Sequence, residues 1–170
     1  KQIIQDFNLK VEAGKKIALV GSTGSGKTTI VNLLMRFYEI DSGEILLDGV
    51  NIRDLSIARL RDAVGIVLQD SILFTDTVKY NLTYADPDVS MEEIEAAAAS
   101  SGCADMIAAW PEGYETILQA SGAGLSQGQR QLLTIGRAFL SYPRILILDE
   151  ATSNVDTTTE KSIQDAMIGL

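Results

Sequence analysis

Residues 21–28, with the sequence GSTGSGKT, decide the fold. They match the pattern G-x-x-x-x-G-K-[ST], which holds phosphate when it joins a strand to a helix. The run before them, KIALV at 16–20, is short and continuously apolar, as expected for a strand covered on both faces. The segment after them, TTIVNLLMRF at 28–37, has the apolar spacing of a buried helix. Strand, glycine-rich loop and helix in this order predict an α/β fold that binds phosphate.

Each residue type in this loop has a physical role. Glycines let backbone N–H groups turn inward around phosphate oxygens, and the helix start adds partial positive charge. We expect Lys27 to reach the β and γ phosphates and the Thr28 hydroxyl to ligate Mg²⁺. The alternative is a glycine-rich turn with an exposed lysine, which the strand–loop–helix context disfavours. The other loop residues expected at the nucleotide are Gly21, Ser22, Thr23, Gly24, Ser25, Gly26 and Thr29.

Two further apolar runs end in polar residues suited to hydrolysis. RILILDE at 144–150 predicts a buried strand after which Asp149 holds Mg²⁺ through its water shell and Glu150 orients or deprotonates a water. VGIVLQ at 64–69 predicts another strand, and Gln69 at its carboxyl end is expected to contact metal and water. Taken alone, these side chains would be interpreted as solvated polar groups. Beside the phosphate loop, they indicate a catalytic set.

The rest of the chain predicts a small β part and several helices. FNLKV at 7–11 alternates like a half-buried strand, and EILLDG at 44–49 ends in an Asp-Gly turn. Capping-box patterns beginning at Ser90, and again at Ser126, each precede a helical stretch. Thr157 is a plausible cap for a final helix. Buried strands that alternate with helices imply a mainly parallel sheet with an inserted helical subdomain.

Composition narrows the class of protein. Hydrophobic residues make up 46% of the 170 residues and charged residues 22%, which argues against disorder. The net charge of −9 disfavours nucleic acid as a partner. Cys103 is the only cysteine, so no intramolecular disulfide can form. No apolar run approaches the roughly 18–20 residues that span a bilayer, and the start of the chain lacks a signal peptide. We therefore expect the chain itself to be neither inserted nor exported.

The stretch GLSQGQRQ at 124–131 looks like a second place to hold an anion. A glycine-bearing turn opens a helix there, and the exposed N–H groups of a helix start favour negative charge. From these eight residues alone, an ordinary N-cap at Ser126 is the favoured interpretation. Gly136, inside the helix that follows, is expected to cost about 1 kcal/mol relative to alanine.

The chain resembles the nucleotide-binding domain of an ABC transporter. The resemblance rests on five stretches in this order and spacing: GSTGSGKT, GIVLQD, LSQGQRQ, ILILDEATS and NVD. LSQGQ is similar to the LSGGQ signature of that family, and the region around 80–116 resembles exporters of drugs, lipids or peptides. The resemblance covers nearly the whole chain. It implies an ATPase that uses ATP and Mg²⁺ and lies at the cytoplasmic face of a membrane. The implied partners are a second nucleotide-binding domain and the transmembrane domains of the transporter.

The resemblance also implies how the two anion sites are used. Two such domains pair head to tail, and each ATP lies between one phosphate loop and the signature of the other domain. Asp156, in SNVD, matches the loop that touches the partner, although it could instead be an ordinary acid at a helix start. Gln127 stands where the signature usually has glycine, and Ala120 where many exporters have an acid. The residues implied to contact ATP held by the partner are Ser126, Gln127, Gly128 and Gln129.

The implied domain organisation is a core at about 1–75 and 138–170 with a helical subdomain at about 76–137. The subdomain would receive helices of the membrane domains in a groove. Five apolar residues could line that groove, although a set with this spacing is more often core: Met91, Ile94, Met106, Ile107 and Trp110. The chain has no histidine, whereas the family has a switch histidine on a later strand, and the aromatic that stacks on adenine is missing too. We therefore expect weak hydrolysis and reduced stability from these residues alone.

Three other functions stay open at this point. A soluble ABC ATPase of translation or DNA repair would need tandem domains or a coiled-coil insertion, which the sequence lacks. A nucleotide-binding module without catalysis would dimerise with ATP but release no phosphate. A generic phosphate-loop kinase leaves LSQGQ unexplained.

Overall fold

The computed structural model describes residues 4–68, 71–84, 86, 88–119 and 122–148. The chain divides into two units, Lys1–Arg61 and Asp62–Leu170, each described here by itself. The predicted cap at Thr157 and the final helix lie outside the described residues, as does Ala120. In the described part of the chain, no helix is long and apolar enough to cross a membrane.

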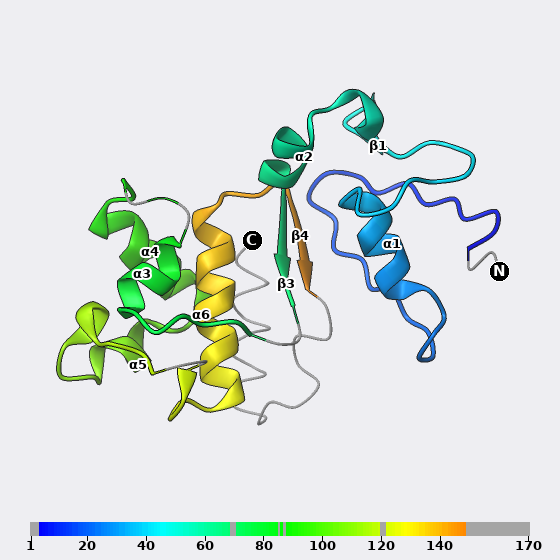
Figure 1. Ribbon diagram of the computed structural model, residues 1–170. Helices are drawn as coiled ribbons and strands as arrows, with labels where there is room; N and C mark the ends of the chain where they lie inside the picture. Colours follow the sequence, from blue (N-terminus) through cyan, green and yellow to red (C-terminus); the bar gives the residue numbers. More distant parts are fainter. Residues whose placement is uncertain (1–3, 69–70, 85, 87, 120–121, 149–170) are drawn as a thin grey trace. The chain divides into compact units, whose positions relative to one another are not determined.

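The first unit contains the helix that follows the phosphate loop and a small antiparallel hairpin (Figure 1). Helix α1 spans Lys27–Leu34, and strands β1 (Leu46–Leu47) and β2 (Val50–Asn51) pair antiparallel. The hairpin turns on Asp48 and Gly49, with φ of 50° and 81°, which confirms the predicted Asp-Gly turn. A 3₁₀ turn, η1 (Ile52–Asp54), and helix α2 (Ile57–Ala63) complete this part of the chain.

The strands predicted at 7–11 and 16–20 are not formed, and these segments carry no regular secondary structure. Their apolar side chains are exposed; Val20, at 92%, is the extreme case. An apolar run signals a tendency to be covered, but a strand exists only where a second strand supplies its hydrogen bonds. Among the described residues, no strand forms a β-ladder with either segment. Helix α1 is likewise half-buried rather than buried.

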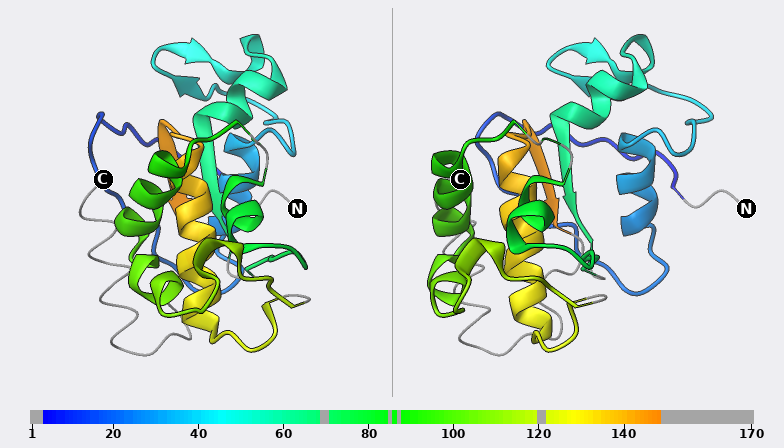
Figure 2. Two further views of the ribbon diagram at one scale, coloured as in Figure 1. Left: turned by 90° about the vertical axis from the view of Figure 1, so that its left-hand side faces the viewer. Right: turned by 60° about the vertical axis from the view of Figure 1, so that its left-hand side comes forward.

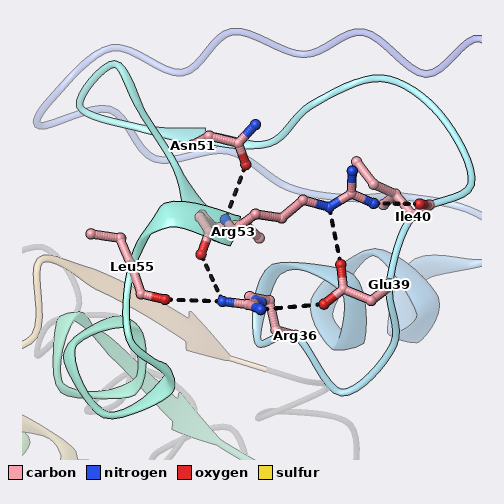
Figure 3. A network of polar contacts seen from close by, with 7 residues as sticks. Arg36, Glu39, Ile40, Asn51, Arg53 and Leu55 are labelled. Atoms are coloured by element: carbon pink, nitrogen blue, oxygen red, sulfur yellow. Dashed lines mark hydrogen bonds and ion pairs between the residues drawn. The ribbon is translucent and has the colours of Figure 1, made fainter.

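A network of polar contacts joins the end of α1 to the chain after the hairpin (Figure 3). The Arg36 guanidinium donates through Nη1 to the carbonyls of Ile52 and Leu55, at 3.0 Å each. Glu39 accepts from Arg53 Nε at 3.0 Å and from Arg36 Nη2 at 3.4 Å, and these contacts, chiefly the one from Arg53, lower its pKa. The network therefore anchors the helix that begins at Lys27.

The second unit contains a parallel strand pair and the helical region. Strand β3 (Val64–Val67) pairs in parallel with β4 (Ile145–Leu148), with Val67 opposite Leu148. This confirms two of the predicted strands and their parallel direction, although the four residues of β4 are half-buried and not buried as predicted. Gly65 in β3 faces Pro143, which precedes β4. A Cβ added at Gly65 would lie 2.9 Å from the Pro143 ring, so this close approach requires glycine.

Helix α6 forms the centre of this unit, between the strand pair and the other helices (Figures 1 and 2). It spans Gln127–Leu140 and buries Leu132, Leu133 and Ile135 in the core. The other elements are α3 (Val78–Thr83), α4 (Met91–Ser101), α5 (Ala104–Ala108) and the 3₁₀ turn η2 (Gly113–Glu115).

The core of this unit includes residues that the sequence had suggested for a groove. Ile94 and Ile107 are fully buried, so groove lining was wrong for these two. Met106 and Trp110 pack, partly buried, against the same core, and Met91 is exposed. Helical spacing brings the buried members of this set to the inner face of their helices, where they join a core cluster that also contains residues of α6.

Candidate nucleotide-binding site

The phosphate loop has the backbone conformation that its glycines permit. Gly24 and Gly26 have φ of 82° and 100°, which favour glycine because they lie in the left-handed region. A Cβ at Gly21 would lie 2.5 Å from Ser25 Oγ and 3.1 Å from Ser25 Cβ, so the serine would have to shift to make room for it. The Ser25 N–H donates to Ser22 O at 3.1 Å and closes the turn. The loop thus delivers the chain directly into α1.

The start of α1 lacks a side-chain cap. Gly26 is its N-cap residue, and no side chain accepts a hydrogen bond from the first turn. The first N–H groups of a helix have no partner within the helix, so they are available to an acceptor from outside. Together with the helix dipole, these groups form an arrangement that favours an anion such as phosphate.

Lys27 places its amine over the loop. Its Nζ donates to Gly21 O at 2.7 Å and to Ser22 O at 3.3 Å. The structure therefore brings the predicted lysine together with the first two loop residues. Thr28 is exposed in the first turn of α1, where its hydroxyl oxygen is accessible to a hard cation, and Thr29 is half-buried. In the described part of the chain, no cluster of three or more His, Cys, Asp or Glu could hold a metal by itself.

The signature stretch forms the predicted capping box at the start of α6. Ser126 Oγ accepts from the Gln129 N–H at 3.2 Å, and the Ser126 N–H donates to Gln129 Oε1 at 2.9 Å. A serine hydroxyl can accept and donate at the same time, so the O–H of this exposed serine stays available to an anion. Gly128 is buried and Gln127 is half-buried.

The remaining predicted site residues follow the carboxyl ends of the strands. Because Val67 lies opposite Leu148, β3 and β4 end at the same edge of the pair. Gln69 comes two positions after β3, and Asp149 directly follows β4. These two residues lie outside the described residues, as do Glu150 and Asp156, so their roles stay predictions.

Sequence reasoning missed a polar cluster around Arg137 in α6. Its guanidinium contacts Asn81 and Ile72 and lies over the rings of Phe74 and Tyr84. Burial lowers the pKa of Arg137 from its ordinary value. A charged residue within the otherwise apolar stretch LLTIGRAFL was the one sequence signal for this cluster.

The glycine-rich loop, the uncapped start of α1 and the Lys27 amine are features of the phosphate-loop class of nucleotide-binding proteins. Residues 4–153 match the ABC transporter family, and the chain belongs to that family.

Known proteins support this relationship along the whole chain. An ABC transporter ATP-binding protein, YfiC of Bacillus subtilis (strain 168), is 50% identical over 170 residues, which are 100% of this chain and 28% of that protein. A fatty acid ABC transporter ATP-binding/permease protein of Mycobacterium bovis (strain ATCC BAA-935 / AF2122/97) is 50% identical over 165 residues, 97% of this chain and 26% of that protein.

Among solved structures, a bacterial Atm1-family ABC exporter with ATP bound matches with a TM-score of 0.81 and 44% identity. The match covers 88% of this chain and 26% of that one. The chain therefore spans about a quarter of the length of these relatives. It is homologous to the ATP-binding domains of exporters.

Proposed function

We propose that the chain binds and hydrolyses ATP as the nucleotide-binding domain of an ABC exporter. The observation that carries this proposal is the start of α1, where an uncapped helix terminus and the Lys27 amine meet at one glycine loop. This arrangement offers several N–H donors and a positive charge to the phosphates of one nucleotide. The exposed Thr28 hydroxyl lies one residue from the lysine and suits the Mg²⁺ that accompanies ATP.

Within this proposal each site residue has a definite task. Thr28, Gln69 and Asp149 hold Mg²⁺, which when bound neutralises charge on the phosphates. Lys27 binds the β and γ phosphates. Glu150 accepts a proton from the attacking water or orients it, and Gln69 helps to place that water.

The signature stretch completes an ATP site on a second domain. Ser126 donates its O–H to the γ-phosphate held by the partner, and the N terminus of α6 adds its partial positive charge. Asp156 contacts the same partner. Two domains thereby close head to tail around two nucleotides, and hydrolysis reopens them. The domain boundaries are those expected from the sequence, a core at about 1–75 and 138–170 and a helical subdomain at about 76–137.

The subdomain transmits this closure to membrane domains of an exporter, at the cytoplasmic face of the membrane. The matching Atm1-family exporter supports export as the process that is driven.

The test compares Lys27→Ala with Lys15→Ala, a matched control at an exposed lysine of the same unit. Hydrogen bonds to charged groups contribute about 1.5–3 kcal/mol. Loss of Lys27 should therefore weaken binding of a fluorescent ATP analogue by about 10- to 150-fold, while the control binds normally. Equal affinity in both variants would rule out phosphate binding by this loop.

Two further variants test catalysis and pairing. Glu150→Gln should bind ATP but release no phosphate, and normal turnover would show that the base lies elsewhere. Ser126→Arg should leave ATP binding by the monomer intact but prevent ATP-dependent dimerisation in size-exclusion chromatography. If Ser126→Arg instead abolishes binding by the monomer, the site is not shared between two domains.

A further inference from the structure

Arg137 joins the signature helix to the segment that follows β3. It lies in α6, half-buried, eleven positions after Ser126. Its Nε donates to Asn81 O at 2.7 Å, Nη1 to Ile72 O at 3.0 Å, and Nη2 to Asn81 Oδ1 at 3.3 Å. Ile72 lies three positions after Gln69, and Asn81 lies in α3. One side chain thus connects α6 to two points on the same segment.

The segment that Arg137 contacts is itself held in one shape by Asn81. This side chain is fully buried, and its Oδ1 accepts from the Phe74 N–H at 2.8 Å. Its Nδ2 donates to Phe74 O and Thr77 O, at 3.0 Å each. A buried amide that satisfies the backbone on both sides closes the turn between Phe74 and α3. Arg137 therefore contacts a pre-organised turn.

Two further contacts strengthen the connection. The rings of Phe74 and Tyr84 stack at 4.9 Å with an interplanar angle of 7°, and Arg137 Cζ lies 5.8 and 5.3 Å from their centroids. One helical turn earlier on α6, Thr134 Oγ1 lies 3.4 Å from Ser71 Oγ. In Figure 1 the segment after β3 runs across α6 toward α3.

We propose that Arg137 is a positioning residue, which holds the segment from Ile72 to Asn81 against the signature helix. Through this segment it would keep Gln69 and Ser126 in the relative position that catalysis requires. This inference rests on the proposed ATPase function. Lysine cannot substitute, because a single ammonium does not present a planar fork to three acceptors and does not stack on two rings. The charge of Arg137 is retained despite its burial, since a guanidinium is not deprotonated in proteins.

The experiment measures ATP hydrolysis and ATP affinity in the full-length protein for Arg137→Gln and Arg137→Lys. The matched control is Arg61→Gln, which removes a guanidinium 4.9 Å from the Phe37 ring. A small misplacement of catalytic groups can lower turnover by about 100-fold. We expect kcat to fall by about 10- to 100-fold in both Arg137 variants, with ATP affinity unchanged. The Arg61→Gln control should keep its activity.

A double-mutant cycle separates positioning from a general structural effect. If Arg137 acts through Gln69, then Arg137→Gln should lower kcat no further in a Gln69→Ala background. Losses that multiply independently would overturn the inference, as would wild-type kcat in Arg137→Gln. If Arg137→Gln does not fold, the same cycle is made with Arg137→Lys.

A second readout does not depend on activity. The amide of Phe74, protected by Asn81 Oδ1, should exchange its hydrogen faster in Arg137→Lys than in Arg61→Gln. Unchanged exchange of the Phe74 amide would overturn the inference about Arg137, whether or not the wild-type protein hydrolyses ATP. Absence of ATP hydrolysis in the wild-type protein would by itself refute only the proposed function.

Discussion

Replacing Gly136 by alanine should destabilise the protein, although helix propensity alone favours alanine by about 1 kcal/mol. Gly136 lies at the crossing of α6 with two other helices. An added Cβ would lie 3.0 Å from Ser101 Oγ in α4 and 3.1 Å from Leu82 Cδ2 in α3. Both neighbours are buried, and Ser101 Oγ also donates to Ala98 O at 3.2 Å. Neither side chain can move without disturbing the core.

The magnitude follows from the two opposing effects. Overpacking a core typically costs about 1–3 kcal/mol, which exceeds the gain in helix propensity. We therefore expect the free energy of unfolding to fall by about 1 kcal/mol in Gly136→Ala. The structure thus reverses the sign expected from sequence alone.

Urea denaturation monitored by tryptophan fluorescence is a suitable assay. Trp110 is the only tryptophan, and it packs against the same core as α6. Ser101→Ala removes the closest atom, so it should cost less stability in the Gly136→Ala background than in wild type. An increase of about 1 kcal/mol in Gly136→Ala would show that the helices do not approach as described.

Further predictions concern the helix cap and the cysteine. Ser90→Ala should lower the free energy of unfolding by about 1 kcal/mol at neutral pH, because Ser90 caps α4. Hydrogen bonds from Ser90, the backbone N–H first, lower the pKa of Glu93, so the stability this carboxylate adds is present above its unfolded pKa. That contribution should disappear as the pH falls through the lowered pKa, which urea titrations at several pH values would reveal; a pH-independent contribution would contradict the bond. Burial raises the pKa of Cys103 to about 11, so the native thiol should resist a thiol reagent at pH 8 and react fully in urea. Rapid labelling of the folded protein would contradict this burial.

Features determined by neighbouring residues could be predicted from the sequence. The two capping boxes and the Asp48–Gly49 turn each depend on residues within four positions of one another, and all three form as expected. The phosphate loop belongs to the same group, because its glycines dictate the backbone locally. The left-handed conformations of Gly24 and Gly26 follow from that local pattern.

Features that depend on distant partners could not be predicted. Arg137 finds its acceptors 56 and 65 positions earlier in the chain, a pairing that no local pattern encodes. The apolar run at 16–20 predicted a strand from side-chain character alone, whereas strand formation depends on a partner. Ile94 and Ile107 presented the same apolar pattern whether they lined a groove or filled a core, and only packing distinguishes these outcomes.

The burial of α6 has a mechanical consequence. Its 14 residues form a rod about 21 Å long, which begins directly after the N-cap residue Ser126 and ends at Leu140. Buried side chains along the length of α6 oppose local unfolding of its ends. A displacement of its first turn is therefore expected to move the helix as one body, and a short connection joins the other end of the helix to β4 at Ile145. The helix is therefore a rigid connection between the two ends of the unit.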